Sequence, residues 1–377
     1  MNLVSVVGAR PQFVKLAPIQ REITARVAGG QLLAHDVVHT GQHYDAAMSE
    51  VFFRELGLSQ PAVNLGVGSG SHARQTANML MALEAYLEDK RPDAVLVFGD
   101  TNSTLAGALA ATKLGLTTVH VEAGLRSFNR CMPEELNRVV TDHLCDLLLV
   151  PTDAALHNLA CEGLSGRSWL VGDVMLDAVI FNLEIARQDS RIVEQLALKG
   201  AEYAVATVHR ASNTHPKVIA QLLEGLNRIA QDMPVVFPMH PRTRAVVQSK
   251  LVGWKPASNL CVVEPLSYLD MLRLVDESAI VLTDSGGLQK ETFILGRPCV
   301  TLREETEWGE TLAAGANIVV GTEPYRLMAA VDNWRKKGWG RADELGRKAL
   351  ALYGQGRAAH RILDAIVADS GLCRSRS

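Results

Sequence analysis

The sequence predicts an α/β protein of two domains, each built on a parallel β-sheet. Short β-branched runs alternate with amphipathic segments of helical length along most of the chain, which is typical of strands joined by covering helices. The length of 377 residues is enough for two separate cores. Because the alternation restarts beyond residue 171, we expect domains at 1–171 and 172–357, with a C-terminal helix of about 358–370 crossing back to the first.

In the first half, each expected strand is an apolar run that ends near a glycine or a small polar residue. Pro11 marks the start of the first helix, because proline is favoured in a first helical turn. A later helix is expected to carry Met48, Val51, Phe52 and Leu56. The other expected elements are strands at 3–7, 35–40, 94–98 and 117–121 and helices at 72–90 and 104–114.

The second half begins with a helical linker near Val171–Ala178, and the alternation then continues. Its expected strands lie at 203–207, 235–238, 260–263, 279–283 and 299–302.

The two halves share a spacing of acidic residues. Asp100 and Glu122 are 22 residues apart, and Asp284 is followed by Glu304 and Glu305 after 20 and 21 residues. Each interval spans one expected helix and one expected strand. We infer two similar halves, each presenting a helix N-terminus to one central cleft.

The composition indicates an ordinary soluble globular protein, with 47% hydrophobic and 21% charged residues. A formal net charge of -3 provides no basic field for nucleic acid. The apolar start at Leu3–Val7 is too short for a signal peptide and no run approaches membrane-spanning length, so we expect a cytoplasmic location and no membrane partner. The six cysteines are scattered without a CxxC pair, which predicts neither a disulfide framework nor a zinc knuckle.

Three carboxylate positions stand where an open α/β fold places ligand chemistry, at strand ends and the helix starts that follow them. Asp100 follows one expected strand, Glu122 ends the next, and Glu134 opens an acidic pair a dozen residues further on. Acids that serve as base and acid need neighbours and burial to tune them, so this ordered set indicates proton transfer. The alternative is that each acid caps a helix or pairs with a nearby arginine.

A serine followed by two glycines predicts a bound diphosphate in the second half. Ser285, Gly286 and Gly287 stand at an expected helix start, where backbone N–H groups can approach phosphate oxygens and the helix dipole favours negative charge. Glu291, two turns further on, is placed to reach ribose hydroxyls. The alternative is an ordinary turn between a strand and a helix.

Cationic residues follow the first expected strand of each half. Arg10 and Lys15 are candidates for phosphate contacts, with two solvated cations as the alternative. His209, at the end of the first strand of the second half, suits a departing diphosphate as a donor of a hydrogen bond or a proton. A structural histidine is the alternative there.

Two suggestive patterns are rejected. Gly66–Gly70 lacks the GxGxxG spacing of a dinucleotide loop, and we expect no strand to lead into it. His39 and His43 are four residues apart, but the glycine between them indicates a turn and no third zinc ligand is evident, so no metal is expected. The GxxxxGK[ST] pattern of a phosphate-binding loop is also missing from the sequence.

Together these residues resemble the non-hydrolysing UDP-N-acetylglucosamine 2-epimerases over nearly the whole chain. The resemblance implies the glycosyltransferase-B architecture, two Rossmann-like domains with parallel sheets facing a central cleft that holds a UDP-sugar. It also implies a homodimer that needs neither metal nor nicotinamide cofactor. The motifs that carry it are Gly-Ala-Arg-Pro at 8–11, Thr-Gly-Gln-His at 40–43, Gly-Asp-Thr-Asn-Ser-Thr at 99–104, Val-Glu-Ala-Gly-Leu-Arg at 121–126, Pro-Glu-Glu-Leu-Asn-Arg at 133–138, His-Arg at 209–210, His-Pro at 240–241, Asp-Ser-Gly-Gly at 284–287 and Thr-Glu at 306–307.

The resemblance implies interconversion of UDP-N-acetylglucosamine and UDP-N-acetylmannosamine. The C2 hydrogen of the sugar is not acidic and the chain has no dinucleotide fingerprint, which favours anti elimination of UDP through 2-acetamidoglucal over transient oxidation. By motif position, Asp100, Glu122 and Glu134 transfer protons, in an order left open, and His209 acts on the diphosphate. The implied substrate-binding residues are Arg10, Lys15, His43, Arg138, His240, Ser285, Gly286, Gly287 and Glu291.

The chain departs from the better-known members of that family in two motifs. Those members often have Gln-Glu-Glu at the positions numbered 289–291 here, where this chain has Lys290 in the middle. They often have Thr-Glu-Arg-Pro-Glu at 306–310, where this chain has Trp308 and a glycine in place of the arginine and the proline. A relative that acts on UDP-2,3-diacetamido-2,3-dideoxyglucuronate shares the Lys and Trp forms, and Lys290, Arg242 or Arg244 would then meet the uronate carboxylate. That sugar is an alternative substrate. Three rival functions also stay open: a glycosyltransferase of the same architecture, a hydrolysing epimerase and a non-catalytic nucleotide-binding protein.

Overall fold

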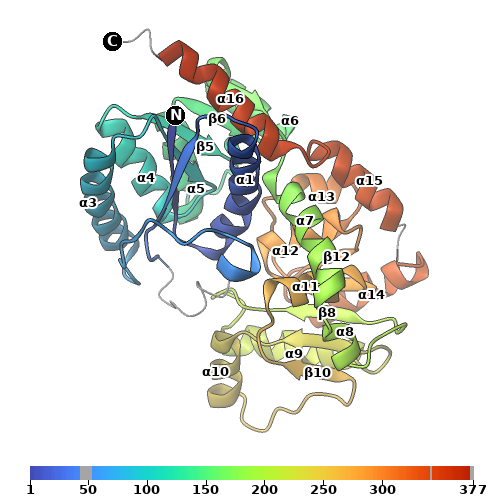
Figure 1. Ribbon diagram of the computed structural model, residues 1–377. Helices are drawn as coiled ribbons and strands as arrows, with labels where there is room; N and C mark the ends of the chain where they lie inside the picture. The colour runs from blue at the N-terminus through green and yellow to red at the C-terminus, as the bar shows by residue number, and fades with distance from the viewer. Residues whose placement is uncertain (43–52, 340–341, 374–377) are drawn as a thin grey trace. The chain divides into compact units, whose positions relative to one another are not determined.

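The computed structural model describes residues 1–42, 53–339 and 342–373, and every structural statement refers to these residues (Figure 1). Contacts divide the chain into two compact units. The first comprises Met1–Ala178 together with Leu352–Ser377, and the second comprises Val179–Ala351. Each unit is a parallel sheet with covering helices, which confirms the predicted α/β class with two Rossmann-like domains.

The first unit contains a seven-stranded parallel sheet in the order β3-β2-β1-β4-β5-β6-β7. The central strand Ala94–Phe98 is buried at all five positions, as expected for a strand covered on both faces. The order changes direction between β1 and β4, and ligands of open α/β sheets bind outside the carboxyl ends at such a point. The strands are β1 Asn2–Val7, β2 Ala34–His39, β3 Val63–Asn64, β4 Ala94–Phe98, β5 Thr117–Val121, β6 Leu147–Val150 and β7 Ser168–Leu170.

Small residues let one helix of the first unit lie close to its sheet. An added Cβ at Gly107 of α4 would lie 2.9 Å from Val97 Cγ1 and 3.2 Å from Val6 Cγ1, so α4 rests directly on β4 and β1. Helix α1 packs against the C-terminal helix α16. The helices are α1 Arg10–Ala28, α3 His72–Lys90, α4 Asn102–Lys113, α5 Pro133–Leu144, α6 Asp153–Cys161 and α16 Ala358–Cys373, with a 3₁₀ turn at Ser165–Arg167.

The second unit contains a six-stranded parallel sheet in the order β10-β9-β8-β11-β12-β13, with its change of direction between β8 and β11. Its strands are β8 Ala204–Thr207, β9 Val235–Pro238, β10 Leu260–Val263, β11 Ile280–Thr283, β12 Cys299–Thr301 and β13 Asn317–Val319. Its helices are α8 Ile192–Gln195, α9 Pro216–Ile229, α10 Pro241–Lys250, α11 Tyr268–Asp276, α12 Gly286–Ile294, α13 Gly309–Ala313, α14 Pro324–Lys336 and α15 Ala342–Leu352, and α7 Val174–Asp189 leads into this unit.

The expected strands and the expected helices at 72–90 and 104–114 lie within two residues of the observed ones, but one expectation is wrong. Strand β3 precedes Gly66–Gly70, so a strand does lead into that loop. The expected helix around Met48 falls largely outside the described residues. Among the described helices, none is both long and apolar enough to cross a membrane.

Two passes of the chain are tied together where it leaves and re-enters the first unit. The backbone N–H of Asp173 donates to the carbonyl oxygen of Tyr353 at 2.9 Å. The carboxylate of Asp177 accepts the N–H groups of Ala358 and Ala359, at 3.2 and 3.0 Å, at the N-terminus of α16. Burial raises the pKa of Asp177 above its usual value. The start of α7 and the start of α16 are thus joined by hydrogen bonds.

Gly172 is predicted to be essential for this crossing. Its φ is +91°, and an added Cβ would lie 2.7 Å from the carbonyl oxygen of Tyr353. At Gly163, φ is +77° and an added Cβ would meet nothing within 4 Å, so Gly163→Ala carries only the left-handed strain of about 1–2 kcal/mol. We expect Gly172→Ala to lower the unfolding midpoint clearly more than Gly163→Ala in thermal unfolding followed by circular dichroism. Equal midpoints would contradict a tight crossing.

Candidate active site

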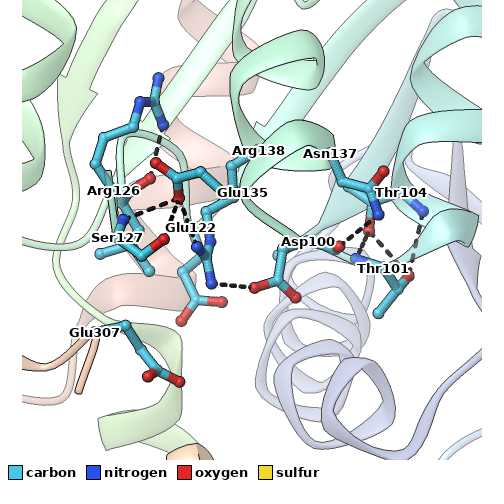
Figure 2. A network of polar contacts seen from close by, with 12 residues as sticks. Asp100, Thr101, Thr104, Glu122, Arg126, Ser127, Glu135, Asn137, Arg138 and Glu307 are labelled. Carbon is cyan, nitrogen blue, oxygen red and sulfur yellow. Dashed lines mark hydrogen bonds and ion pairs between the residues drawn. The ribbon is translucent and has the colours of Figure 1, made fainter. Parts of the chain in front are cut away.

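The turn after β4 brings Asp100 to the carboxyl edge of the first sheet (Figure 2). Gly99 adopts φ +62°, which glycine tolerates without a Cβ penalty. Thr101 caps α4 by accepting the N–H of Thr104, and the hydroxyl of Thr104 donates to the carbonyl oxygen of Phe98 at 2.6 Å. These bonds fix the short connection on which Asp100 stands.

Arg138 connects Asp100 to helix α5. One guanidinium nitrogen donates to Asp100 Oδ2 at 2.6 Å and another to Glu135 Oε2 at 2.8 Å (Figure 2). The amide of Asn137 donates to the backbone carbonyl of Asp100 at 2.9 Å. Arg138 is buried, whereas the Asp100 side chain is 33% exposed. Asp100 is therefore a carboxylate of fixed position that solvent or a ligand can still reach.

Glu122 directly follows β5 in a strained backbone conformation. Its φ is +72°, which is uncommon for a non-glycine residue and is found preferentially at functional sites. The N–H groups of Glu122 and Ala123 both donate to the carbonyl oxygen of Leu149 at 3.1 Å, which holds the turn. The side chain is almost fully buried and forms an ion pair with Lys15 of α1.

The pair between Lys15 and Glu122 lies over Gly99. An added Cβ there would be 3.0 Å from Lys15 Nζ and 3.2 Å from Glu122 Oε2, so a larger residue would press on both partners. Lys15, which the sequence indicated as a phosphate ligand, thus meets a carboxylate in this structure. Its role toward phosphate stays a prediction.

The two acids in the first turn of α5 differ sharply. Glu135 is buried and accepts the N–H groups of Ser127 and Phe128, each at 2.9 Å, together with Arg138. Burial would raise the pKa of Glu135, but the hydrogen bonds from Ser127, Arg138 and Phe128 outweigh it and hold the pKa below its usual value. Glu134 is exposed at the same helix end. Glu135 is therefore structural, and Glu134 is the acid of this pair that a ligand can reach.

A buried polar chain supports the turn from behind, and sequence reasoning missed it. His120 Nδ1 lies 2.7 Å from Asp142 Oδ1, and its Nε2 lies 2.7 Å from the carbonyl oxygen of Gly99. Asp142 also accepts the N–H of Gly124 at 3.1 Å and pairs with Arg126 at 2.7 Å. Burial would raise the pKa of Asp142, but His120 and Arg126 outweigh it and keep the pKa below its usual value. A histidine between two valines of a buried strand was the available signal.

In the second unit, Asp284 orients His209. Asp284 is fully buried and accepts the backbone N–H groups of His209 and Arg210, at 3.0 and 2.9 Å, and the amide of Asn213 at 3.2 Å. His209 Nδ1 lies 3.0 Å from Asp284 Oδ1, while the side chain is 40% exposed. Burial would raise the pKa of Asp284, but the bonds and charge of His209 and the Arg210 N–H outweigh it and lower the pKa. The exposed edge of the imidazole is left for a ligand.

The N-terminus of α12 presents the predicted diphosphate segment. Ser285 is the N-cap, and its hydroxyl accepts the N–H of Leu288 at 3.4 Å. The N–H groups of Gly286 and Gly287 precede the intrahelical ladder, and an added Cβ at Gly287 would meet no atom within 4 Å. Glu291 lies buried two turns further along the helix. This helix end fits an anion.

The remaining candidates lie in different settings. Arg10 is the partly exposed first residue of α1, and His240 caps α10 by accepting the N–H of Arg242 at 3.1 Å. The ring of His240 lies 5.8 Å from that of His209, so these two candidates are neighbours. His43 lies outside the described residues. In residues 1–42, 53–339 and 342–373 no group of three or more His, Cys, Asp or Glu side chains could hold a metal ion.

His39 has a structural environment. Its Nδ1 accepts the N–H of Gly41 at 2.8 Å, and its ring stacks on Phe13 at 5.2 Å between centroids. These contacts place it in the aromatic core beneath the first strand–helix turn.

Comparisons with known proteins agree with this arrangement. A family model described as UDP-N-acetylglucosamine 2-epimerase matches residues 26–367. A Methanococcus maripaludis protein named UDP-N-acetylglucosamine 2-epimerase homolog is 44% identical over 339 residues, covering 89% of this chain and 92% of that protein. The UDP-2,3-diacetamido-2,3-dideoxy-D-glucuronate 2-epimerase of Pseudomonas aeruginosa is 42% identical over 372 residues, covering 97% and 99%.

A solved structure extends the similarity to three dimensions. The crystal structure of Methanocaldococcus jannaschii UDP-GlcNAc 2-epimerase in complex with UDP-GlcNAc and UDP matches with a TM-score of 0.87 at 38% identity. The match covers 98% of this chain and 100% of that chain. The predicted glycosyltransferase-B-like fold is thereby confirmed. This chain belongs to the UDP-N-acetylglucosamine 2-epimerase family, and it is an isomerase.

Proposed function

We propose that the protein interconverts UDP-N-acetylglucosamine and UDP-N-acetylmannosamine by anti elimination and re-addition of UDP. The observation that carries the proposal is the set of carboxylates at one sheet edge, with Asp100 on Arg138 and Glu122 on Lys15. Exposed Glu134 stands on the same helix as Arg138. Such a set can supply both a base and an acid.

The proposed reaction balances without a redox partner. One carboxylate takes the C2 proton while the C1–O bond breaks. The electron pair of the C1–O bond leaves with the diphosphate of UDP. A C1=C2 double bond forms, giving 2-acetamidoglucal. In the return step a second acid protonates C2 from the other face while a diphosphate oxygen of UDP attacks C1. No nicotinamide or metal is part of this proposal.

In the first unit, we assign proton transfer to Asp100, Glu122 and Glu134. Arg138 and Lys15 hold two of these acids in place as ion pairs, and a positioned carboxylate can accept a proton. Glu134, with its exposed side chain, is placed to deliver one. Which acid serves which face of C2 stays open.

In the second unit, we assign the diphosphate to the ends of β8 and β11. His209, oriented by Asp284, can donate to the departing diphosphate. Ser285, Gly286 and Gly287 supply the helix end, and Glu291 would contact ribose. The further binding assignments from the sequence are Arg10, His43, Arg138 and His240.

Two observations bear on the identity of the sugar. The Pseudomonas aeruginosa relative acts on a diacetamido-uronate by its name, and it is as similar to this chain as relatives named for UDP-N-acetylglucosamine. Against a uronate, Arg244 is paired with Glu264 at 2.8 Å and Lys290 is buried against Trp308, so two of the three proposed carboxylate ligands, all but Arg242, are already engaged. We therefore favour UDP-N-acetylglucosamine. A homodimer, a cytoplasmic location and supply of a sugar for polysaccharide biosynthesis belong to the same proposal.

The test of substrate is turnover of each UDP-sugar separately, with no acceptor present. Conversion of UDP-N-acetylglucosamine to UDP-N-acetylmannosamine supports the proposal. Turnover confined to the diacetamido-uronate would replace the substrate, release of free N-acetylmannosamine would indicate a hydrolysing enzyme, and a strict need for an acceptor would indicate a glycosyltransferase.

Elimination predicts exchange with solvent at C2. In deuterated water we expect the epimerised product to carry deuterium at C2, because the proton removed from one face is replaced from the solvent-equilibrated acid on the other. Proton NMR of the H2 signal checks this. A product that keeps its original hydrogen would exclude proton abstraction and favour a hydride route.

The acid assignment predicts large losses of turnover in variants that still fold. Asp100→Asn, Glu122→Gln and Glu134→Gln should each lower kcat about 10²–10⁴-fold, the usual effect of removing an acid or base. The matched control is Glu135→Gln, which alters a buried acid with three partners and should lower the unfolding midpoint, whereas Glu134→Gln should leave it unchanged. Near-normal kcat in all three variants would make helix capping and arginine pairing the better account of these acids.

A further inference from the structure

Trp308 is a buried tryptophan whose indole N–H lacks a hydrogen-bond acceptor within the described chain. Only 8% of the residue is exposed. Burying such a donor without an acceptor is costly, so an orphaned one needs an explanation. Its Nε1 lies 3.3 Å from the position of an added Cβ at Gly286, the first residue of α12. The unsatisfied donor therefore stands beside the helix end that fits an anion.

Lys290 holds the indole from its face. Its Nζ lies 4.2 Å from the centroid of the Trp308 ring, and the lysine is only 2% exposed. A cation over an aromatic face is attracted by the ring's negative face. The interaction fixes the ring plane and places a positive charge close to the N–H.

Paired charges border this helix end. Glu307 lies against Gly286 and pairs with Arg303 at 2.7 Å and with Arg210 at 3.7 Å. Burial would raise the pKa of Glu307, but Arg303 and Arg210 outweigh it and hold the pKa below its usual value. Two arginines thus share one carboxylate beside Gly286, and the helix dipole adds to the positive side.

We propose that Trp308 donates its indole N–H to an anionic oxygen of the ligand bound at the N-terminus of α12, with Lys290 as its positioning residue. This inference rests on the proposed function for the ligand's identity. The oxygen belongs to the distal phosphate of the nucleoside diphosphate, or to a carboxylate on the attached sugar. A phosphate oxygen and a carboxylate oxygen would both bind well to a fixed, desolvated donor, because hydrogen bonds to a charged acceptor are stronger than neutral ones.

Calorimetric titration of the full chain with UMP, UDP and a UDP-uronate tests the proposal. Trp308→Phe keeps an aromatic ring for Lys290 and removes the N–H together with the five-membered ring of the indole. If the distal phosphate is the acceptor, this variant should bind UDP at least about tenfold more weakly and UMP with unchanged affinity. If the sugar carboxylate is the acceptor, UDP affinity should be unchanged and UDP-uronate affinity should fall. Lys290→Met should weaken the same ligand, and the double variant should lose less than the two single losses combined.

Trp334 provides the matched control. Its indole N–H is also buried without an acceptor among the described residues, and Lys337 lies 5.6 Å from its ring, but it belongs to α14 in the core of the second unit. Trp334→Phe should leave all three affinities unchanged. Unchanged UDP and UDP-uronate affinities in Trp308→Phe would overturn the inference while leaving the epimerase proposal intact. Failure of the unaltered protein to bind UDP would instead remove the proposed function.

A second readout does not depend on the variant's folding. The chain has 5 tryptophans, so five indole N–H signals are expected in a nitrogen-15 NMR spectrum. The Trp308 signal should move downfield when its ligand is added, as a new hydrogen bond requires. If Trp308→Phe does not fold, the signal is identified by replacing the other four tryptophans singly. A Trp308 signal that no ligand moves would also overturn the inference.

Discussion

The geometry of the first unit depends on the buried guanidinium of Arg138. It bridges Asp100, on the turn after β4, and Glu135, in the first turn of α5, with both contacts under 3 Å. A buried charge that lost either partner would be left uncompensated at a cost of several kcal/mol, so the three groups must stay together. Because Glu135 also grips the N–H groups of Ser127 and Phe128, the loop before α5 is set by the same bridge. The position of Glu134 follows from it, since both acids share one helical turn.

Both units contain an acid between a strand and the helix that follows it, but the acid has a different role in each unit. Asp100 receives a cation and stays one-third exposed, which leaves a reactive carboxylate. Asp284 accepts hydrogen bonds from two backbone N–H groups and an asparagine, and it acts on a ligand only by orienting His209. The similar spacing of acids in the sequence therefore indicated related architecture correctly, but could not distinguish a reacting acid from an anchoring one. Burial and partners make that distinction, and both depend on contacts far apart in the chain.

The same limit explains what sequence reasoning found and what it missed. Apolar β-branched runs bounded by glycine revealed the central strands, whereas the edge strands Ser168–Leu170 and Asn317–Val319 are short and partly exposed and carry little periodic signal. Strand-end positions located Asp100 and Glu122. Their partners could not be read from spacing, because Lys15 meets Glu122 across 107 residues and the cation type alone suited phosphate equally well.

The departures of this chain from the better-known epimerases contact each other in the structure. Lys290 and Trp308 are 18 residues apart in the sequence, yet the ammonium lies on the indole face. A buried lysine would be costly without that partner, and a tryptophan beside Gly286 would lack the cation that fixes its plane. The contact explains why a lysine is buried beside this helix end, and it does so without a uronate ligand for the lysine.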